Sequence, residues 1–177
     1  PEFLEDIIEK NLNCIHYIKT PNEQLPLFNG AVSTNFNQIQ KYLENYKPGT
    51  KDNNIGGLFK IKHKNHFLLL DIDKPPQKKF SKSYQSGPLS FEYFLDGIKI
   101  ITNSGFGKDI SKKAEILSRL TACQSTLTIN DTSITKFEKN EMICKIFGNS
   151  IKSSFKSFDF SSKKENGFIS CAASNNG

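Results

Sequence analysis

The feature that most constrains this chain is a change in the spacing of its apolar residues near position 50. In the first 19 residues they recur three or four positions apart, at Leu4, Ile7, Ile8, Leu12, Ile15 and Ile18. That spacing predicts an amphipathic helix, which has to end before Pro21 because proline cannot continue it. A second, short helix ending at Pro48-Gly49 is predicted by Phe36, Ile39, Leu43 and Tyr46.

From Gly56 onward the apolar residues tend to alternate with polar ones, which is typical of β-strands. The predicted strands cover residues 58–62, 67–72, 89–95, 98–102, 126–129, 133–137, 142–147, 151–160 and 168–172. Asp96-Gly97, between two of them, is the strongest hairpin turn in the chain. Many short strands separated by turns predict a mainly β fold, an antiparallel β-sandwich. The chain thus divides into a helical part, residues 1–50, and a sheet part, residues 56–177.

The basic composition does not favour a nucleic-acid partner. The 177 residues carry a formal net charge of +6, but Arg119 is the only arginine. Proteins that read nucleic acid specifically favour arginine, whose planar fork matches phosphate and base edges. The longest apolar run, Phe67–Leu70, is far too short to span a membrane. The sequence gives no basis for predicting an oligomeric state.

Candidate chemistry is sparse when the residues are taken alone. The four cysteines form no Cys-x-x-Cys pair, so a zinc knuckle is excluded. His63 and His66 flank the turn of the first predicted hairpin, where a solvated tip is commoner than a metal pair. Asp71 and Asp73 share a strand face and form either a carboxylate pair or, more commonly, a solvated strand end.

Three ordered groups of segments resemble the heparinase II/III family of polysaccharide lyases. Arg119–Leu127 is similar to a family segment that begins with arginine and ends in His-Asn/Ser-Thr. Gly87-Pro88-Leu89-Ser90-Phe91-Glu92 resembles the family's central strand, which an Asn/Asp-x-Gly turn follows. The remaining matching segments are residues 27–30, 56–61, 67–76 and 100–105. The resemblance spans nearly the whole chain.

This resemblance implies that residues 1–50 end an α/α toroid and that residues 56–177 form a β-sandwich, incomplete at its C-terminal end. The chain would then be an internal piece of a longer protein of the periplasm or cell envelope. Such proteins bind an acidic glycan between toroid and sandwich and cleave it by β-elimination. The resemblance therefore implies an acidic polysaccharide as the partner.

Several family histidines are replaced in this chain. Gln85 and Gln124 stand where histidines are expected, and Asn175 replaces the histidine of a Ser-His-Asp-Gly turn. Because amides neither take a proton near neutral pH nor bind zinc well, the family's zinc site is expected to be lost, leaving no cofactor. The resemblance places Tyr84 and these three amides in the catalytic cleft. Further residues expected to bind substrate are Ser83, Glu92, Asn103 and Arg119.

Two functions stay open at this point. The first is a lyase that cleaves a uronate-containing glycan, with Tyr84 as an acid or base. The second is an inactive glycan-binding or structural module of the same fold, which the replaced histidines favour. Tyr84 also has a plainer interpretation, as an aromatic side chain packed in a strand.

Overall fold

The computed structural model describes residues 2–33, 41, 54–165 and 168–176 of the chain. The predicted second helix, residues 36–46, lies almost wholly outside the described residues. The same holds for most of the predicted boundary between the two parts, which therefore stays a prediction.

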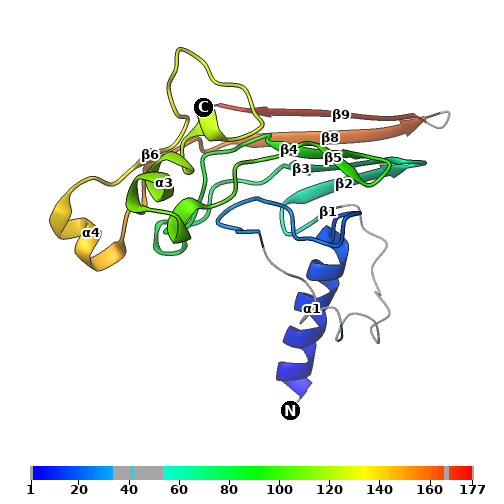
Figure 1. Ribbon diagram of the computed structural model, residues 1–177, viewed down its shortest axis with the longest axis horizontal. Helices are drawn as coiled ribbons and strands as arrows, with labels where there is room; N and C mark the ends of the chain where they lie inside the picture. Colours follow the sequence, from blue (N-terminus) through cyan, green and yellow to red (C-terminus); the bar gives the residue numbers. More distant parts are fainter. Residues whose placement is uncertain (1, 34–40, 42–53, 166–167, 177) are drawn as a thin grey trace.

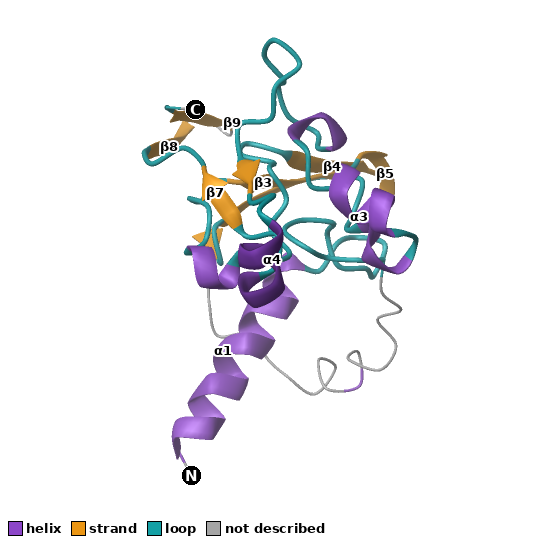
Figure 2. Cartoon of the chain, turned by 90° about the vertical axis from the view of Figure 1, so that its left-hand side faces the viewer, coloured by secondary structure: helices purple, strands orange, loops and turns teal. Residues whose placement is uncertain are grey.

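The first helix, α1 (Glu2–Ile18), forms where the apolar spacing predicts it. Its C-terminal end rests on the main sheet through Tyr17, which is the only buried residue of the helix. The N-terminal half projects away from the sheets, as Figures 1 and 2 show. Four apolar side chains of that half are exposed: Phe3, Leu4, Ile7 and Ile8. Within the described residues, no helix has the length and apolar content that a membrane crossing requires.

The main sheet is antiparallel, with the strand order β1-β2-β3-β4-β5. Its strands are β1 (Asn54–Ile55), β2 (Leu58–His63), β3 (His66–Asp71), β4 (Phe91–Leu95) and β5 (Ile98–Ile101). The β2–β3 and β4–β5 hairpins form where the alternating pattern predicts them, with turns at Lys64-Asn65 and Asp96-Gly97. Asp96 and Gly97 both have a positive φ, the backbone conformation that such tight hairpin turns require.

The two faces of this sheet are covered differently. On one face, a core cluster lies beneath the end of α1 and the loop that follows it. Its members are Phe28, Leu58, Phe67, Leu69 and Phe94. The other face is covered by a separate hairpin, β8 (Phe158–Glu165) and β9 (Phe168–Asn175), with the ring centres of Phe59 and Phe160 4.8 Å apart. Figure 1 shows this hairpin stacked on the main sheet, which makes the fold a β-sandwich.

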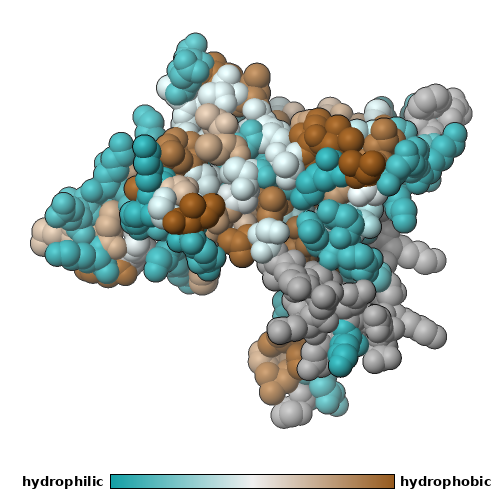
Figure 3. All heavy atoms as spheres, in the orientation of Figure 1, coloured by the Kyte–Doolittle hydropathy of each residue, from teal (hydrophilic) through white to brown (hydrophobic). Residues whose placement is uncertain are grey.

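The remaining elements lie mostly at one end of the two sheets (Figures 1 and 2). They are η1 (Lys78–Phe80), η2 (Gly107–Asp109), α3 (Lys112–Leu117), η3 (Thr121–Cys123), β6 (Lys136–Phe137), α4 (Glu141–Phe147) and β7 (Ile151–Ser153). Strands β6 and β7 pair with each other. Along β5, apolar side chains remain exposed at Ile98 and Ile100, and Figure 3 shows an apolar patch in this region of the surface.

The structure corrects the strand predicted over residues 142–147, which is the helix α4. The side chain of Asn140 caps this helix by accepting hydrogen bonds from the main-chain N–H groups of Met142 and Ile143. Gly148 ends it with a φ of 67°. Asparagine is a favoured N-cap residue and glycine a favoured helix terminator, so these flanking residues outweigh the β-forming tendency of the isoleucines.

The hairpin predicted over residues 126–137 is reduced to one isolated bridge, between Ile129 and Thr132. Main-chain N–H groups that a hairpin would use are donated to side-chain hydroxyls instead. Ile134 N–H donates to Thr121 Oγ1, and Thr135 N–H donates to Ser86 Oγ. Serine and threonine hydroxyls compete with ladder hydrogen bonds in this way.

Candidate functional site

A tight turn brings the loop after α1 against the segment that precedes β4. Ala31 N–H donates to Phe28 O at 3.0 Å, and the two residues between them, Asn29 and Gly30, have φ angles of 47° and 95°. A side chain at Gly30 would place its Cβ only 2.6 Å from Ser83 Cβ. Only glycine permits this approach. It holds Asn29 beside the segment of Ser83 and Tyr84.

Asp71 ends β3 beneath this turn and is almost completely buried, with 4% of its surface exposed. Its carboxylate accepts two long hydrogen bonds, each of 3.3 Å, from Asn29 Nδ2 and from the main-chain N–H of Asp73. Among the described residues, none forms an ion pair with it. Burial raises the pKa of Asp71 to about 7, against the pull of those two hydrogen bonds. The solvated strand end expected from the sequence is therefore wrong for Asp71.

Asp71 lines a small polar pocket with a volume of about 360 Å³. We call this cavity the polar pocket. It is lined by Asn29, Gly56, Asp71, Asp73, Lys74, Pro76, Phe80, Ser83 and Tyr84. Ser83 is exposed and Tyr84 is buried. Burial, and then the charge of Asp71, raise the pKa of the Tyr84 phenol, which also hydrogen-bonds Thr135. The pocket thus combines a carboxylate that titrates near neutral pH with a phenol that stays protonated.

Gln85 and Gln124, the positions of two replaced histidines, meet at one main-chain oxygen. Gln85 Nε2 and Gln124 Nε2 both donate to Ser118 O, at 2.9 Å and 2.7 Å. Gln85 is 1% exposed, and it also donates to Gly105 O and accepts from Gly30 N–H. Its amide therefore fixes the Asn29-Gly30 turn from below. Direct contact of either glutamine with a glycan stays a prediction.

Glu92 is fully buried within β4, and three donors gather at one of its two carboxylate oxygens. Its Oε1 accepts from Thr102 Oγ1 at 2.8 Å and from the N–H groups of Leu27 and Asn103 at 3.2 Å and 3.4 Å. Its Oε2 lies 3.4 Å from Lys99 Nζ. Asn103 is also buried, and its Oδ1 accepts from the N–H of Ser125. Glu92 thereby joins the loop after α1 to the sheet, and Asn103 joins the residues after β5 to Ser125.

Arg119 is 3% exposed and donates to three main-chain oxygens: Tyr84 O, Asn149 O and Ser81 O. Its guanidinium also lies 3.8 Å from the centre of the Phe137 ring. Burial lowers its pKa to about 10, so the group stays cationic at neutral pH. Arg119 lines a larger groove of about 990 Å³ beside α3 and β6. Within the described residues its bonds serve to hold the Tyr84 segment.

The residues at the expected zinc positions do not fit that ion. Gln85 and Gln124 present amide donors to main-chain oxygens, and amides are poor zinc ligands. Among the described residues, no group of three His, Cys, Asp or Glu side chains stands close enough to hold a metal. Asn175, the third replaced position, lies on β9 opposite Phe158, in the hairpin that covers the other face.

The fold and the polar pocket define a β-sandwich domain that is preceded by a helix. The family model for the heparinase II/III-like C-terminal domain matches residues 47–177. The chain therefore belongs to the heparinase II/III-like family through this domain. A search of curated proteins finds no match.

Solved structures of similar fold include a heparan sulfate lyase and heparinase III. Heparan sulfate lyase HepC from Pedobacter heparinus is 17% identical, with a TM-score of 0.58 over 98% of this chain and 31% of that chain. A structure of heparinase III is 14% identical, with a TM-score of 0.59 over 98% of this chain and 32% of that one. The heparinase III-BT4657 gene product is 16% identical, with a TM-score of 0.57 over 78% and 27%. The chain spans less than a third of each of these proteins, and at such identities the likeness concerns the fold.

The structure thus gathers the sequence-predicted residues into two layers. Ser83 and Tyr84 line the polar pocket, whereas Gln85, Glu92, Asn103 and Arg119 are buried. Of these four, Gln85 holds the Asn29-Gly30 turn and Arg119 holds the Tyr84 segment. Gln124 is half-buried beside Gln85. The residues underrated by sequence reasoning are Asn29 and Asp71. Asn29-Gly30 indicates a turn and Asp71 and Asp73 stand two residues apart, but neither pattern indicates that the two segments meet.

Proposed function

We propose that the chain is the C-terminal portion of a polysaccharide lyase that cleaves a uronate-containing glycan by β-elimination. The observation that carries the proposal is the polar pocket, in which Asp71, Asn29, Lys74 and Tyr84 line one cavity. Its position on a heparinase II/III-like domain supports the choice of an acidic glycan as substrate.

In β-elimination a base removes the proton from the carbon beside the uronate carboxylate. The electron pair forms a carbon–carbon double bond, the glycosidic carbon–oxygen bond at the next carbon breaks, and the leaving oxygen takes a proton. The carbon acid is very weak unless a neighbouring group neutralises the carboxylate. The reaction therefore needs a base, an acid and a donor for the carboxylate.

Asp71 is the proposed base, because a base is most effective when its pKa lies near the working pH, as the value of about 7 does. Lys74 and the Asn29 amide are the proposed donors for the uronate carboxylate. Tyr84 is the proposed acid that protonates the leaving oxygen, since its raised pKa keeps the phenol in the protonated form. Gln85 and Arg119 are positioning residues that hold this segment.

The test is a lyase assay on the full-length protein with a panel of acidic glycans, following the absorbance of the unsaturated uronate product. We expect Asp71→Asn to lower kcat by a factor of about 100 or more, the usual share of general base catalysis. Tyr84→Phe should lower kcat with little change in KM. Lys163→Ala, on the exposed surface of β8, is the matched control. If none of the glycans in the panel gives product, the proposed catalysis is refuted.

The second candidate is an inactive glycan-binding module, and the amides at positions 85 and 124 favour it. Both are engaged with main-chain oxygens, and neither can act as a base. This candidate predicts that the full-length protein binds an acidic glycan and releases no unsaturated product. Restored turnover in the Gln85→His/Gln124→His double variant would instead indicate an enzyme that has lost its histidines.

A further inference from the structure

A groove of about 520 Å³ lies at the opposite end of the β2–β3 hairpin from the polar pocket. It is formed where the end of α1 and the following turn meet the turn of that hairpin. Its charged and titratable lining residues are His16, Lys19, Glu23, Lys60, Lys62, Lys64, His66 and Asp96. We call this surface the lysine groove.

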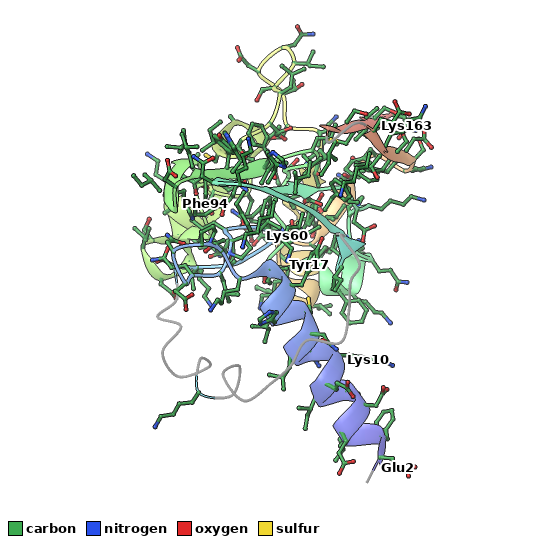
Figure 4. All side chains as sticks on the ribbon, turned by 90° about the vertical axis from the view of Figure 1, so that its right-hand side faces the viewer. Glu2, Lys10, Tyr17, Lys60, Phe94 and Lys163 are labelled. Atoms are coloured by element: carbon green, nitrogen blue, oxygen red, sulfur yellow. The ribbon has the colours of Figure 1, made fainter. Side chains whose placement is uncertain are left out.

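One lysine of the groove is held in place by the rest of the structure. Lys60 Nζ donates to Tyr17 O at 2.8 Å and lies 4.0 Å from the centre of the Tyr17 ring. The Tyr17 hydroxyl in turn accepts from Lys60 N–H at 2.9 Å and donates to Leu58 O. Figure 4 shows Lys60 and Tyr17 together at the junction of helix and sheet. The ammonium is therefore fixed at the base of the groove.

The positive charges of the groove exceed its negative ones. Glu23 pairs with Lys19 at 2.8 Å, and Asp96 is the only other carboxylate among the described lining residues. No described carboxylate forms an ion pair with Lys62 or Lys64, and both side chains are exposed. Like charges that crowd together in this way favour a bound anion.

The pKa values in the groove agree with this crowding. Burial and then the charge of Lys62 lower the pKa of Lys60. Burial and then the charges of Lys60 and Lys19 lower the pKa of His16. For both side chains the protonated form is less stable in the groove than in water. A bound anion would offset the repulsion between the positive charges.

We propose that the lysine groove binds sulfate or carboxylate groups of an acidic glycan at a subsite separate from the polar pocket. The occupant follows from the proposed function, on which the choice of a glycan rests. Five residue steps along β3, from His66 in the groove to Asp71 in the polar pocket, separate the two sites by roughly 17 Å at strand spacing. A long glycan would therefore be held at both sites, whereas a short one would reach only one of them.

The test compares two double variants of the full-length protein in calorimetric titrations with heparin-derived oligosaccharides. Lys62→Ala/Lys64→Ala removes two exposed charges of the groove. Lys163→Ala/Lys164→Ala removes the same charge from β8, and Figure 4 shows Lys163 far from Lys60. We expect the first variant to bind about 3–10-fold more weakly, with a shallower salt dependence, and the second to bind as the parent does. Circular dichroism checks that both variants remain folded.

Equal affinity in parent and groove variant, or an equal loss in both variants, would overturn the subsite. Tighter binding of single-stranded DNA than of a glycan of matched charge would overturn the choice of a glycan. The measurement does not use turnover, so it separates the two proposals. If the protein cleaves a glycan but the groove variant binds as tightly as the parent, only the subsite is refuted. If the groove variant binds more weakly but no product forms, only the lyase activity is refuted.

Discussion

Two buried carboxylates on the same face of the main sheet have opposite surroundings. Glu92, in the central part of the sheet, has three donors on one oxygen and the Lys99 ammonium beside the other. Asp71, at the end of β3, has two hydrogen bonds of 3.3 Å and no described cation paired with it, and it borders a cavity. A buried carboxylate with several donors and a neighbouring cation stabilises a fold, whereas one with few partners beside a cavity is available for chemistry.

The largest effect should follow from breaking the Glu92 network. Glu92→Ala removes the acceptor of three hydrogen bonds and leaves the Lys99 ammonium without its partner. We expect the free energy of unfolding to fall by about 3–5 kcal/mol, as for a buried pair that loses one member. Urea unfolding measures the loss. Glu165→Ala, on an exposed strand position, should change it by less than about 0.5 kcal/mol. Similar losses in both variants would contradict the structural role of Glu92.

Asp71 should instead make stability depend on pH. Its pKa is raised from 3.8 to about 7 by folding, so the native state binds more protons than the unfolded state between these values. Stability therefore falls as pH rises through this window and is lowest above it. Asp71→Asn should remove this dependence. The free energy of unfolding of the variant, relative to that of the parent, should therefore rise by about 1–3 kcal/mol from about pH 5 to about pH 8.

The measurement is urea unfolding of both proteins across that pH range. A difference between Asp71→Asn and the parent that stays constant with pH would show that Asp71 does not titrate in the native protein. The comparison with Glu92 would then rest on hydrogen bonding alone.

How far the sequence predicts this structure depends on whether the information is local. The first helix and the two hairpins follow from apolar spacing and from Asp96-Gly97, all of which act within a few residues. The strand predicted at 142–147 is wrong because Asn140 and Gly148, just outside it, define a helix. The sequence favours a solvated strand end over a carboxylate pair for Asp71, because nothing in its neighbourhood shows that the Asn29 turn covers it. Contacts between distant segments, such as that of Gly30 with Ser83, cannot be predicted from the spacing of residues along the chain.

Lys99→Met sharpens the comparison because it removes the cation beside Glu92, and Asp71 likewise has no described cation paired with it. The change keeps the aliphatic length of the side chain but removes the ammonium that lies 3.4 Å from Glu92 Oε2. Because Lys99 is partly exposed and the Oε1 hydrogen bonds remain, we expect a loss of only about 1–2 kcal/mol in urea unfolding. A loss as large as that of Glu92→Ala would mean that the ion pair, rather than the hydrogen bonds, dominates the network.

The smallest effect should come from removing one of the two donors to Asp71. Asn29→Gly keeps the positive φ of 47° accessible and deletes the amide that donates to Asp71 Oδ2. Because this hydrogen bond favours the ionised carboxylate, its loss should raise the pKa of Asp71 further, by a fraction of a unit. Carboxyl-carbon NMR titration of the protein measures the shift, and Asn22→Gly in the exposed turn after α1 is the control. An unchanged or lowered pKa would show that Asn29 does not stabilise the charge. The N–H of Asp73 would then be the one remaining described donor that stabilises the ionised Asp71.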